Sequence, residues 1–285
     1  FQHGSEETMP LIAMTREMGS LGKDVAAALA DRLDKQVVHH EIIDNLASKM
    51  RLRKSHVIRF LEGKSGIWER LTTDKTSLSI YTADETFALA ESGKVAVIRG
   101  WGATHLLRPV GHVITVRVCA PFEVRVKRML ERLNTDDRAF VENEIRLSEE
   151  AHGAITRRHF GINWQDSEHY DVALNTERLT VEECADEVMA LLDDETFQET
   201  QESQRRFRNL ALSAHVRAAL RQDARTSKMA FSVTCADGVA TLAGLVDPGQ
   251  EPKDAVEVAA KVPGVKEIRN ELRVVALSAR HHVEG

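Results

Sequence analysis

The segment 11–25, LIAMTREMGSLGKDV, has the residue types and spacing that best suit phosphate binding. Its apolar start favours a strand, a glycine turn ending in lysine follows, and the rest has helical spacing. Such a turn exposes backbone N–H groups to an anion, and the helix dipole favours negative charge there. Only Gly22 and Lys23 match the strict GxxxxGK[ST] pattern, because Glu17 takes the first glycine position and Asp24 the Ser/Thr position. The pattern alone leaves an ordinary strand-to-helix turn as the alternative.

The chain around this turn alternates short apolar runs with stretches of helical spacing. The runs cover residues 11–14, 37–38, 95–98, 113–118 and 172–174. Between them, Val25, Leu29 and Leu33 recur at helical spacing, as do the apolar residues that follow Pro121. This order predicts an α/β domain with a mostly parallel sheet flanked by helices.

The last part of the chain has a different order. Leu212, Val216 and Leu220 indicate a helix, and two strand-like runs follow, separated only by Asp237 and Gly238. An Asp-Gly pair between strands favours a two-residue hairpin turn, in which both residues have positive φ. A second helical pattern and a final alternating run complete a predicted small α+β domain of order αββαβ.

Residues 193–206, DDETFQETQESQRR, are polar and acidic, which predicts a linker or a solvated helical extension. We therefore expect a first domain at 6–192 and a second at 207–277. Residues 1–206 hold 35 acidic and 27 basic side chains, whereas 207–277 hold 8 and 10. An acidic first domain argues against nucleic acid as a partner, because nucleic-acid affinity comes mainly from lysine and arginine on phosphates.

Composition excludes several classes of protein. The three cysteines stand far apart with no CxxC pair, which fits neither a disulfide framework nor a four-ligand zinc site. Histidine pairs occur at 39–40 and 281–282, but there is no HExxH, so we expect no metal site of protein ligands. No run reaches the roughly 18 apolar residues of a membrane span, and no secretion signal is evident. The expected location is the cytoplasm.

Five segments, in order and with matching spacing, resemble the cytidylate kinase-like family of P-loop nucleoside monophosphate kinases. They are TREMGSLGKDVAAALADRL, HHEIIDNLA, ESGKVAVIRGWGATHLL, VRVCAPFEVRVKRMLERL and RRHFGINWQDSEHYDVALNTERLTVEECADEV. The resemblance covers nearly all of residues 10–193 and implies a P-loop kinase fold. It also implies transfer of phosphate from ATP, with Mg²⁺, to a nucleoside monophosphate such as CMP or dCMP.

The resemblance also implies roles for individual residues. Those that would hold the ATP phosphates are Arg16, Gly19, Ser20, Leu21, Gly22, Lys23 and Asp24. Lys23 would neutralise phosphate charge in catalysis, together with Arg157 and Arg158 from a lid-like region. Arg125 and Arg128, one helical turn apart, and Arg99 would bind substrate. The alternative for any one arginine is a solvated surface charge.

Some positions depart from the family's pattern. His40 stands where the family has an Asp. Trp101 stands where the family's glycine turn has an arginine between two glycines, and the nearest arginine in this chain is Arg99. In the lid, Glu149, Glu150 and His152 replace an Asp and two arginines. Losing a cation from the transition state costs orders of magnitude in rate. A catalytically weak or inactive nucleotide sensor is therefore the alternative function.

The basic, apolar-patterned segment 51–64 falls where acceptor-binding helices insert in such kinases. Some of its cations would then meet the monophosphate. The alternatives are contact with an anionic membrane or an ordinary solvated helix.

Residues 207–275 resemble a BON domain through FSVTCADGVATLAGLV, KVPGVKEI and RNELRVV. BON domains are associated with binding phospholipid surfaces or other proteins and have no catalytic role. The resemblance implies attachment or regulation, through a homo-oligomer, a protein partner or, less favoured, phospholipid. A small packing module is the alternative.

Overall fold

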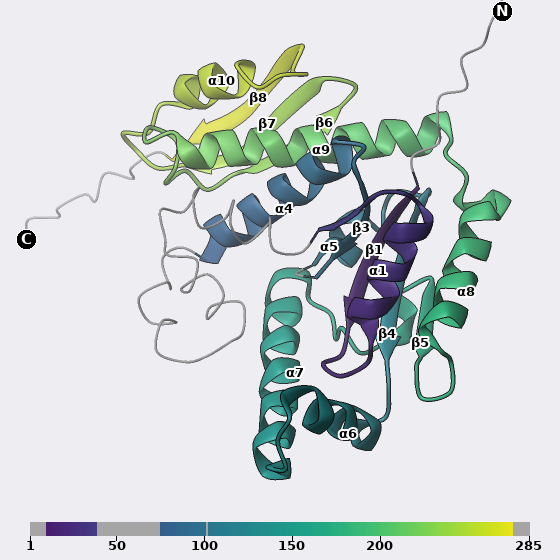
Figure 1. Ribbon diagram of the computed structural model, residues 1–285. Coiled ribbons are helices and arrows are strands. Elements are labelled where there is room, and N and C mark those ends of the chain that lie inside the picture. Colours follow the sequence, from purple (N-terminus) through teal and green to yellow (C-terminus); the bar gives the residue numbers. More distant parts are fainter. Residues whose placement is uncertain (1–9, 39–74, 101, 276–285) are drawn as a thin grey trace, which may run out of the picture. The chain divides into compact units, whose positions relative to one another are not determined.

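The computed structural model describes residues 10–38, 75–100 and 102–275 (Figure 1). The predictions made for His40, Trp101 and the segment 51–64 lie outside the described residues. Tertiary contacts divide the chain into two units, Phe1–Phe207 and Arg208–Gly285.

The first unit holds a parallel five-stranded sheet in the order β2-β3-β1-β4-β5. Its strands are β1 (Leu11–Arg16), β2 (Gln36–Val38), β3 (Val95–Arg99), β4 (Val113–Cys119) and β5 (Val172–Asn175). Each predicted apolar run forms one of them, so the sheet prediction is confirmed. Strands β2 and β3 lie on one side of β1, and β4 and β5 lie on the other, so the direction of strand addition reverses at β1. Open α/β sheets bind ligands at such a reversal, outside the carboxyl ends of the strands.

The helices of this unit are α1 (Gly22–Arg32), α4 (Lys75–Glu91), α5 (Ala103–Leu107), α6 (Phe122–Leu133), α7 (Arg138–Phe160) and α8 (Val181–Asp193). Helices α1, α4, α5 and α8 pack against the sheet, whereas α6 and α7 pack on each other. Helices α1 and α8 lie side by side (Figure 1) and share one core with β1, β3, β4 and β5. Helix α6 follows β4 directly and packs on α7 through Val126, Met129, Val141 and Ile145. At the carboxyl end of the sheet, α1 therefore follows β1, and the α6–α7 pair follows the neighbouring strand β4.

The second unit has the predicted αββαβ order. Helix α9 (Gln201–Gln222), in which the division between units falls, is followed by β6 (Ser232–Ala236), β7 (Val239–Val246), α10 (Pro252–Ala260) and β8 (Glu267–Val274). Asp237 and Gly238 join β6 to β7 with φ of 52° and 92°, so the hairpin turn is confirmed. Strand β7 pairs antiparallel with β6 and parallel with β8. Helices α9 and α10 share a core with the buried residues of β6 and β7.

Between α8 and this unit, the chain has more structure than a bare linker. A short 3₁₀ helix covers Glu195–Phe197, and α9 begins at Gln201. Ser203 is buried, and its Oγ lies 2.7 Å from Nδ1 of His112 at the start of β4. The domain limits 6–192 and 207–277 and the linker between them stay predictions. Among the described helices, none has both the length and the apolar character that a membrane crossing requires.

Two histidines of the first unit lie among aromatic rings. His152 on α7 stacks on Trp164, with ring centroids 4.1 Å apart, and the ring of His105 lies 5.1 Å from that of Phe160. Burial, reinforced by neighbouring positive groups, lowers the pKa of His152 to about 3 and that of His105 to about 4. Both rings are therefore neutral in the folded protein at pH 7.

We expect the free energy of unfolding to fall as the pH drops from about 6.5 towards 4. In this window His105 and His152 take up protons in the unfolded chain but not in the folded protein. Each histidine that binds a proton only when unfolded lowers the free energy of unfolding by roughly 1.4 kcal/mol per pH unit. Urea unfolding at pH 7, 6 and 5 measures the effect. The His152→Phe variant keeps an aromatic ring against Trp164 and should show a shallower pH dependence; an unchanged slope would contradict the assignment.

Candidate phosphate-binding site

The turn between β1 and α1 has a backbone that requires glycine. Gly19 has a φ of 81°, and Leu21, which precedes the helix, also adopts the left-handed conformation with a φ of 60°. A Cβ at Gly19 would lie 2.8 Å from the carbonyl oxygen of Arg125, and one at Gly22 would lie 2.6 Å from Cβ of Arg16. The turn is therefore clamped between the end of β1 and helix α6, which leaves no room for side chains at these positions.

The carbonyl oxygens of the turn all accept hydrogen bonds from within the protein. The Glu17 oxygen accepts from the N–H and the hydroxyl of Ser20, at 3.2 and 2.8 Å. The oxygens of Met18 and Gly19 accept from Arg125 and Arg128, at 3.4 and 3.5 Å. The Ser20 oxygen accepts from the hydroxyl of Thr176, at 2.9 Å. The N–H groups of the turn are different. In the described part of the chain, no acceptor is found for five of them: Met18, Gly19, Leu21, Gly22 and Lys23. A run of free N–H groups at a helix start is an anion-binding cradle.

The carboxylate of Glu17 turns away from this cradle. It lies 2.6 Å from the guanidinium of Arg117 and 3.3 Å from that of Arg125, and it accepts from the N–H of Ala120 at 3.1 Å. Glu17 and Arg125 are both buried, and the other end of Arg125 forms a 2.6 Å ion pair with Glu149 of α7. An acidic residue at the first glycine position therefore braces the turn from behind and puts no negative charge in front of it.

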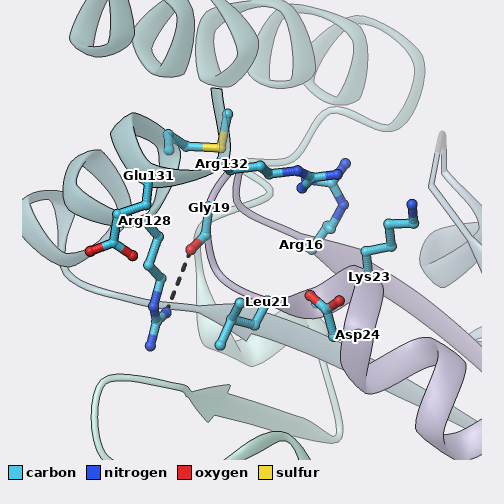
Figure 2. Close-up of a pocket in the computed structure, with 10 residues that line it drawn as sticks. Arg16, Gly19, Leu21, Lys23, Asp24, Arg128, Glu131 and Arg132 are labelled. Atoms are coloured by element: carbon cyan, nitrogen blue, oxygen red, sulfur yellow. Dashed lines mark hydrogen bonds between the residues drawn. The ribbon is translucent and has the colours of Figure 1, made fainter. Parts of the chain in front are cut away.

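In front of the turn lies a pocket of about 510 Å³ (Figure 2). Its lining comes from the end of β1, the turn, the start of α1 and one side of α6: Arg16, Gly19, Leu21, Gly22, Lys23, Asp24, Arg128, Met129, Glu131 and Arg132. Figure 2 shows Arg132 of α6 pointing towards Arg16 of β1, while Arg128 is held at Gly19 and, at 2.6 Å, at the carbonyl oxygen of Thr176. The pocket joins the N–H cradle to cations from three elements.

The cations at this end of the sheet destabilise one another's charged forms. Burial, followed by repulsion from Arg99 and Arg132, lowers the pKa of Arg16 to about 10. Burial also lowers the pKa of Arg99, which ends β3 opposite Met14 of β1 and is 6% exposed. Asp24 is the nearby negative group that opposes both shifts. A ligand carrying several negative charges would relieve this repulsion, and a neutral ligand would not.

The structure brings most of the sequence-predicted phosphate residues together. Those in the pocket lining are Arg16, Gly19, Leu21, Gly22, Lys23, Asp24 and Arg128. Ser20 is fully buried and serves the turn through its bond to Glu17. Arg125 lies behind the turn, as described above. Arg157 and Arg158 are exposed on α7, outside the pocket lining that the described residues define.

Sequence reasoning missed Arg132, Glu131 and the supporting Thr176. Arg132 was detectable, because it follows Arg125 and Arg128 at helical spacing, one turn further along α6. Thr176, one residue after β5, gave no signal, because its role depends on β4 and β5 being neighbours in the sheet. Among the described residues, no group of three or more His, Cys, Asp and Glu side chains lies together in a way that suits a metal ion.

A parallel sheet whose first strand leads through a phosphate-type turn into a helix defines a P-loop kinase-type fold. Residues 11–178 match the cytidylate kinase-like family, and the chain belongs to that family. Residues 210–276 match the BON domain. The chain is thus a kinase-like unit followed by a BON domain.

The chain is also similar to individual proteins. The cytidylate kinase of Methanothermobacter thermautotrophicus is 28% identical over 115 residues, which is 40% of this chain and 69% of that protein. The crystal structure of an uncharacterized protein from Eubacterium ventriosum is 20% identical, with a TM-score of 0.51 over 65% of this chain and 99% of that one, and shows the same fold. Shikimate kinase from Bacteroides thetaiotaomicron gives 14% identity and a TM-score of 0.39 over 65% of this chain and 99% of its own.

Proposed function

We propose that this protein transfers the γ-phosphoryl group of ATP to a nucleoside monophosphate of the CMP or dCMP type. The observation that carries the proposal is the pocket in front of the β1–α1 turn, which combines free N–H groups with converging cations in a chain of the cytidylate kinase-like family. The similar protein of Methanothermobacter thermautotrophicus is named cytidylate kinase. A cytoplasmic enzyme acting on free nucleotides, without nucleic acid, fits the acidic composition.

In this proposal the turn holds the donor phosphates. Their oxygens accept hydrogen bonds from the free N–H groups between Gly19 and Lys23, and the Lys23 ammonium neutralises charge on the transferring group. Arg16, Arg128 and Arg132 approach from β1 and α6 and stabilise the charge that spreads over the phosphoryl oxygens. The contribution of the protein is therefore positioning and charge stabilisation.

We infer that Asp24 would help to hold the Mg²⁺ that accompanies ATP. The Asp24 carboxylate lies in the lining beside Lys23, where the strict motif has Ser or Thr, and magnesium prefers one or two carboxylates together with substrate phosphates. Bound there, the ion would neutralise phosphate charge and help align the donor. Asp24 then has two effects in this chain, since it already opposes the mutual repulsion of Arg16 and Arg99.

The acceptor phosphate is assigned to Arg99 at the carboxyl end of β3, and Arg157 and Arg158 of α7 keep their proposed part in catalysis. Arg99 is buried at the end of β3, and Arg157 and Arg158 are exposed on α7, from which they would reach the phosphates only after a movement. Arg125, predicted from sequence as a substrate ligand, is proposed instead to position the turn, because its guanidinium already contacts Glu17, Met18 and Glu149.

The second candidate function is a nucleotide sensor with weak or no turnover. The observation in its favour is that Glu149 of α7 is engaged with Arg125, while Arg157 and Arg158 face solvent. A protein that binds ATP without closing cations over it would hold nucleotide and report its presence. The BON domain would then transmit this state to a protein partner, another copy of the chain or, less favoured, a phospholipid surface.

Steady-state ADP formation with ATP, Mg²⁺ and a panel of pyrimidine and purine monophosphates separates the two functions. The proposal expects turnover that depends on the acceptor, with CMP or dCMP preferred. Tight ATP binding without turnover for any acceptor would reject the kinase and support the sensor.

Arg132→Ala is expected to raise the Kd for ATP about tenfold, since it removes one charge-assisted contact to phosphate. The effect should shrink at high salt, because Arg132 is exposed. Isothermal titration calorimetry on the full chain measures it. Arg206→Ala is the matched control, because Arg206 is an exposed arginine outside the pocket lining; equal affinities for the two variants would contradict the placement of Arg132.

A further inference from the structure

The sheet of the BON domain has two edge strands, and they differ in how they are covered. At the β6 edge, the carbonyl oxygen of Val233 accepts hydrogen bonds from the side chains of Ser213 and Arg217 of α9, at 2.9 and 2.6 Å. Val233 itself is buried. The other edge, β8, is eight residues long and mostly exposed. A long edge strand with open backbone groups is a template for pairing with another strand.

The backbone groups of β8 that face outward are those of its even-numbered residues. The N–H of Val275 bonds to the carbonyl oxygen of Val246 at 2.9 Å, so odd-numbered residues are the ones that pair with β7. Before the strand, the Gly238 oxygen accepts from the N–H groups of both Lys266 and Glu267, at 2.8 and 3.3 Å. Residues 268, 270, 272 and 274 then point their N–H and C=O groups away from the sheet. Among the described contacts, one of these outward-facing groups has a partner: the N–H of Leu272 donates to Oδ1 of Asn270, at 3.1 Å. The edge is open apart from this local cap.

The side chains of β8 separate into two rows. The even-numbered row includes Ile268 and Leu272, which are half-buried and pack against the domain core. The odd-numbered row faces solvent and alternates in sign: Glu267, Arg269, Glu271 and Arg273, all exposed. Charges on an edge strand ordinarily prevent pairing. Regular alternation instead creates a pattern that another strand can match.

We propose that β8 pairs antiparallel with β8 of a second copy of this chain, about a two-fold axis through Asn270. In this register Glu267 lies opposite Arg273 of the other copy, and Arg269 lies opposite Glu271. The same pairs recur on the other side of the axis, since a two-fold interface is self-complementary. Ile268 lies opposite Leu272, so apolar side chains also meet on the core side.

The hydrogen bonds and the charges favour the same register. Because the outward-facing groups belong to even-numbered residues, even must pair with even, and the charged residues fall on non-hydrogen-bonded pairs, where side chains approach most closely. Shifting the partner by two residues in either direction would place Arg269 against Arg273 or against Arg269 of the other copy. Like charges in those positions are unfavourable. The strand thus specifies its own partner and register.

Pairing of this kind would join two three-stranded sheets into one continuous sheet, with about six backbone hydrogen bonds between the copies. Two of these bonds use the N–H of Leu272, which must first leave Oδ1 of Asn270 in each copy. The contact area of a strand edge is small, so the dimer should be weak and concentration-dependent. Salt should weaken it further, because all its charged pairs are exposed. This dimer does not depend on whether the first unit is a kinase or a sensor.

Charge reversal tests the register with the full-length chain. Sedimentation equilibrium of the wild type, up to roughly 100 μM chain, should show a reversible monomer–dimer equilibrium. Arg269→Glu and Glu271→Arg should each weaken the dimer at least about tenfold, because each makes two like-charge pairs. The double variant Arg269→Glu/Glu271→Arg restores opposite charges and should recover the wild-type dissociation constant. A mixture of the two single variants should form a heterodimer with about the wild-type dissociation constant, although each variant alone dimerises at least about tenfold more weakly.

Asn270→Pro provides a second test that does not involve charge. The N–H of Asn270 points outward, so proline removes a donor of the dimer without removing one of the β7–β8 bonds. It should abolish the dimer and leave the thermal unfolding of the monomer within a few degrees of wild type. A wild type that remains monomeric, or a dimer that withstands these reversals, would overturn the proposal. Nucleotide turnover should be the same in all variants, so failure here is distinguishable from failure of the proposed function.

Discussion

Replacing Lys23 with alanine is expected to lower kcat/KM for phosphoryl transfer by about 10²- to 10³-fold. Lys23 lies at the start of α1 in the pocket lining, beside the N–H groups that have no acceptor among the described contacts. A cation in this position stabilises charge on the transferring group more strongly in the transition state than in bound ATP. The loss should therefore appear mainly in kcat, with a smaller rise in the KM for ATP.

Lys127→Ala is the matched control, because Lys127 is an exposed lysine of α6 that is absent from the pocket lining defined by the described residues. Lys23 is itself exposed, so its removal should leave the melting temperature unchanged. Initial rates of ADP formation across ATP concentrations measure both constants. If Lys23→Ala and Lys127→Ala behaved alike, the phosphates of ATP would have to bind elsewhere.

The second large effect is on stability. Arg125→Met should lower the free energy of unfolding by about 2–3 kcal/mol, because it takes a buried charged donor away from two carbonyl oxygens and from Glu149, while Glu17 keeps its 2.6 Å ion pair with Arg117. Arg125 is 5% exposed and contacts the Glu17 carboxylate, the Ala120 and Met18 carbonyl oxygens, and Glu149. Methionine keeps most of the volume, so the loss reports the contacts and not a cavity. Urea unfolding at pH 7 measures it.

Two further variants make this result specific. Adding Glu149→Gln to Arg125→Met removes the carboxylate that loses its ion pair with Arg125 and should recover part of the loss. Arg138→Met, which breaks exposed ion pairs with Glu123 and Glu142, should cost less than about 1 kcal/mol. A cost for Arg125→Met as small as that for Arg138→Met would mean that the charges behind the turn do not brace it.

Local patterns were sufficient to predict much of the fold. The inner strands β1, β3 and β4 are short apolar runs, because they are buried on both faces and need no polar alternation. The edge strands β2 and β5 are partly exposed, but their valines and leucine still gave short apolar runs. The Asp237–Gly238 turn followed from backbone chemistry alone, since few residue pairs accept positive φ at both positions. The turn before α1 was located for the same reason, as its glycines and its helix start are local features.

The arginines could not be sorted in the same way. Arg125 and Arg128 are one turn apart on α6, and spacing alone gives them the same expected role. In the structure Arg125 lies behind the turn against Glu17, whereas Arg128 reaches the pocket. What separates them is the buried carboxylate of Glu17, whose position depends on β4 lying next to β1. Tertiary neighbours of this kind leave no trace in the spacing of one helix.

Transfer of label from [γ-³²P]ATP to CMP is the decisive measurement of phosphoryl transfer by this chain. The full-length chain, with Mg²⁺ and CMP or dCMP, should produce labelled nucleoside diphosphate in proportion to enzyme and acceptor, and the Lys23→Ala protein should produce about 10²-fold less. ATP that binds but transfers its label to no monophosphate, or only to water, would contradict the account and leave the protein a nucleotide sensor.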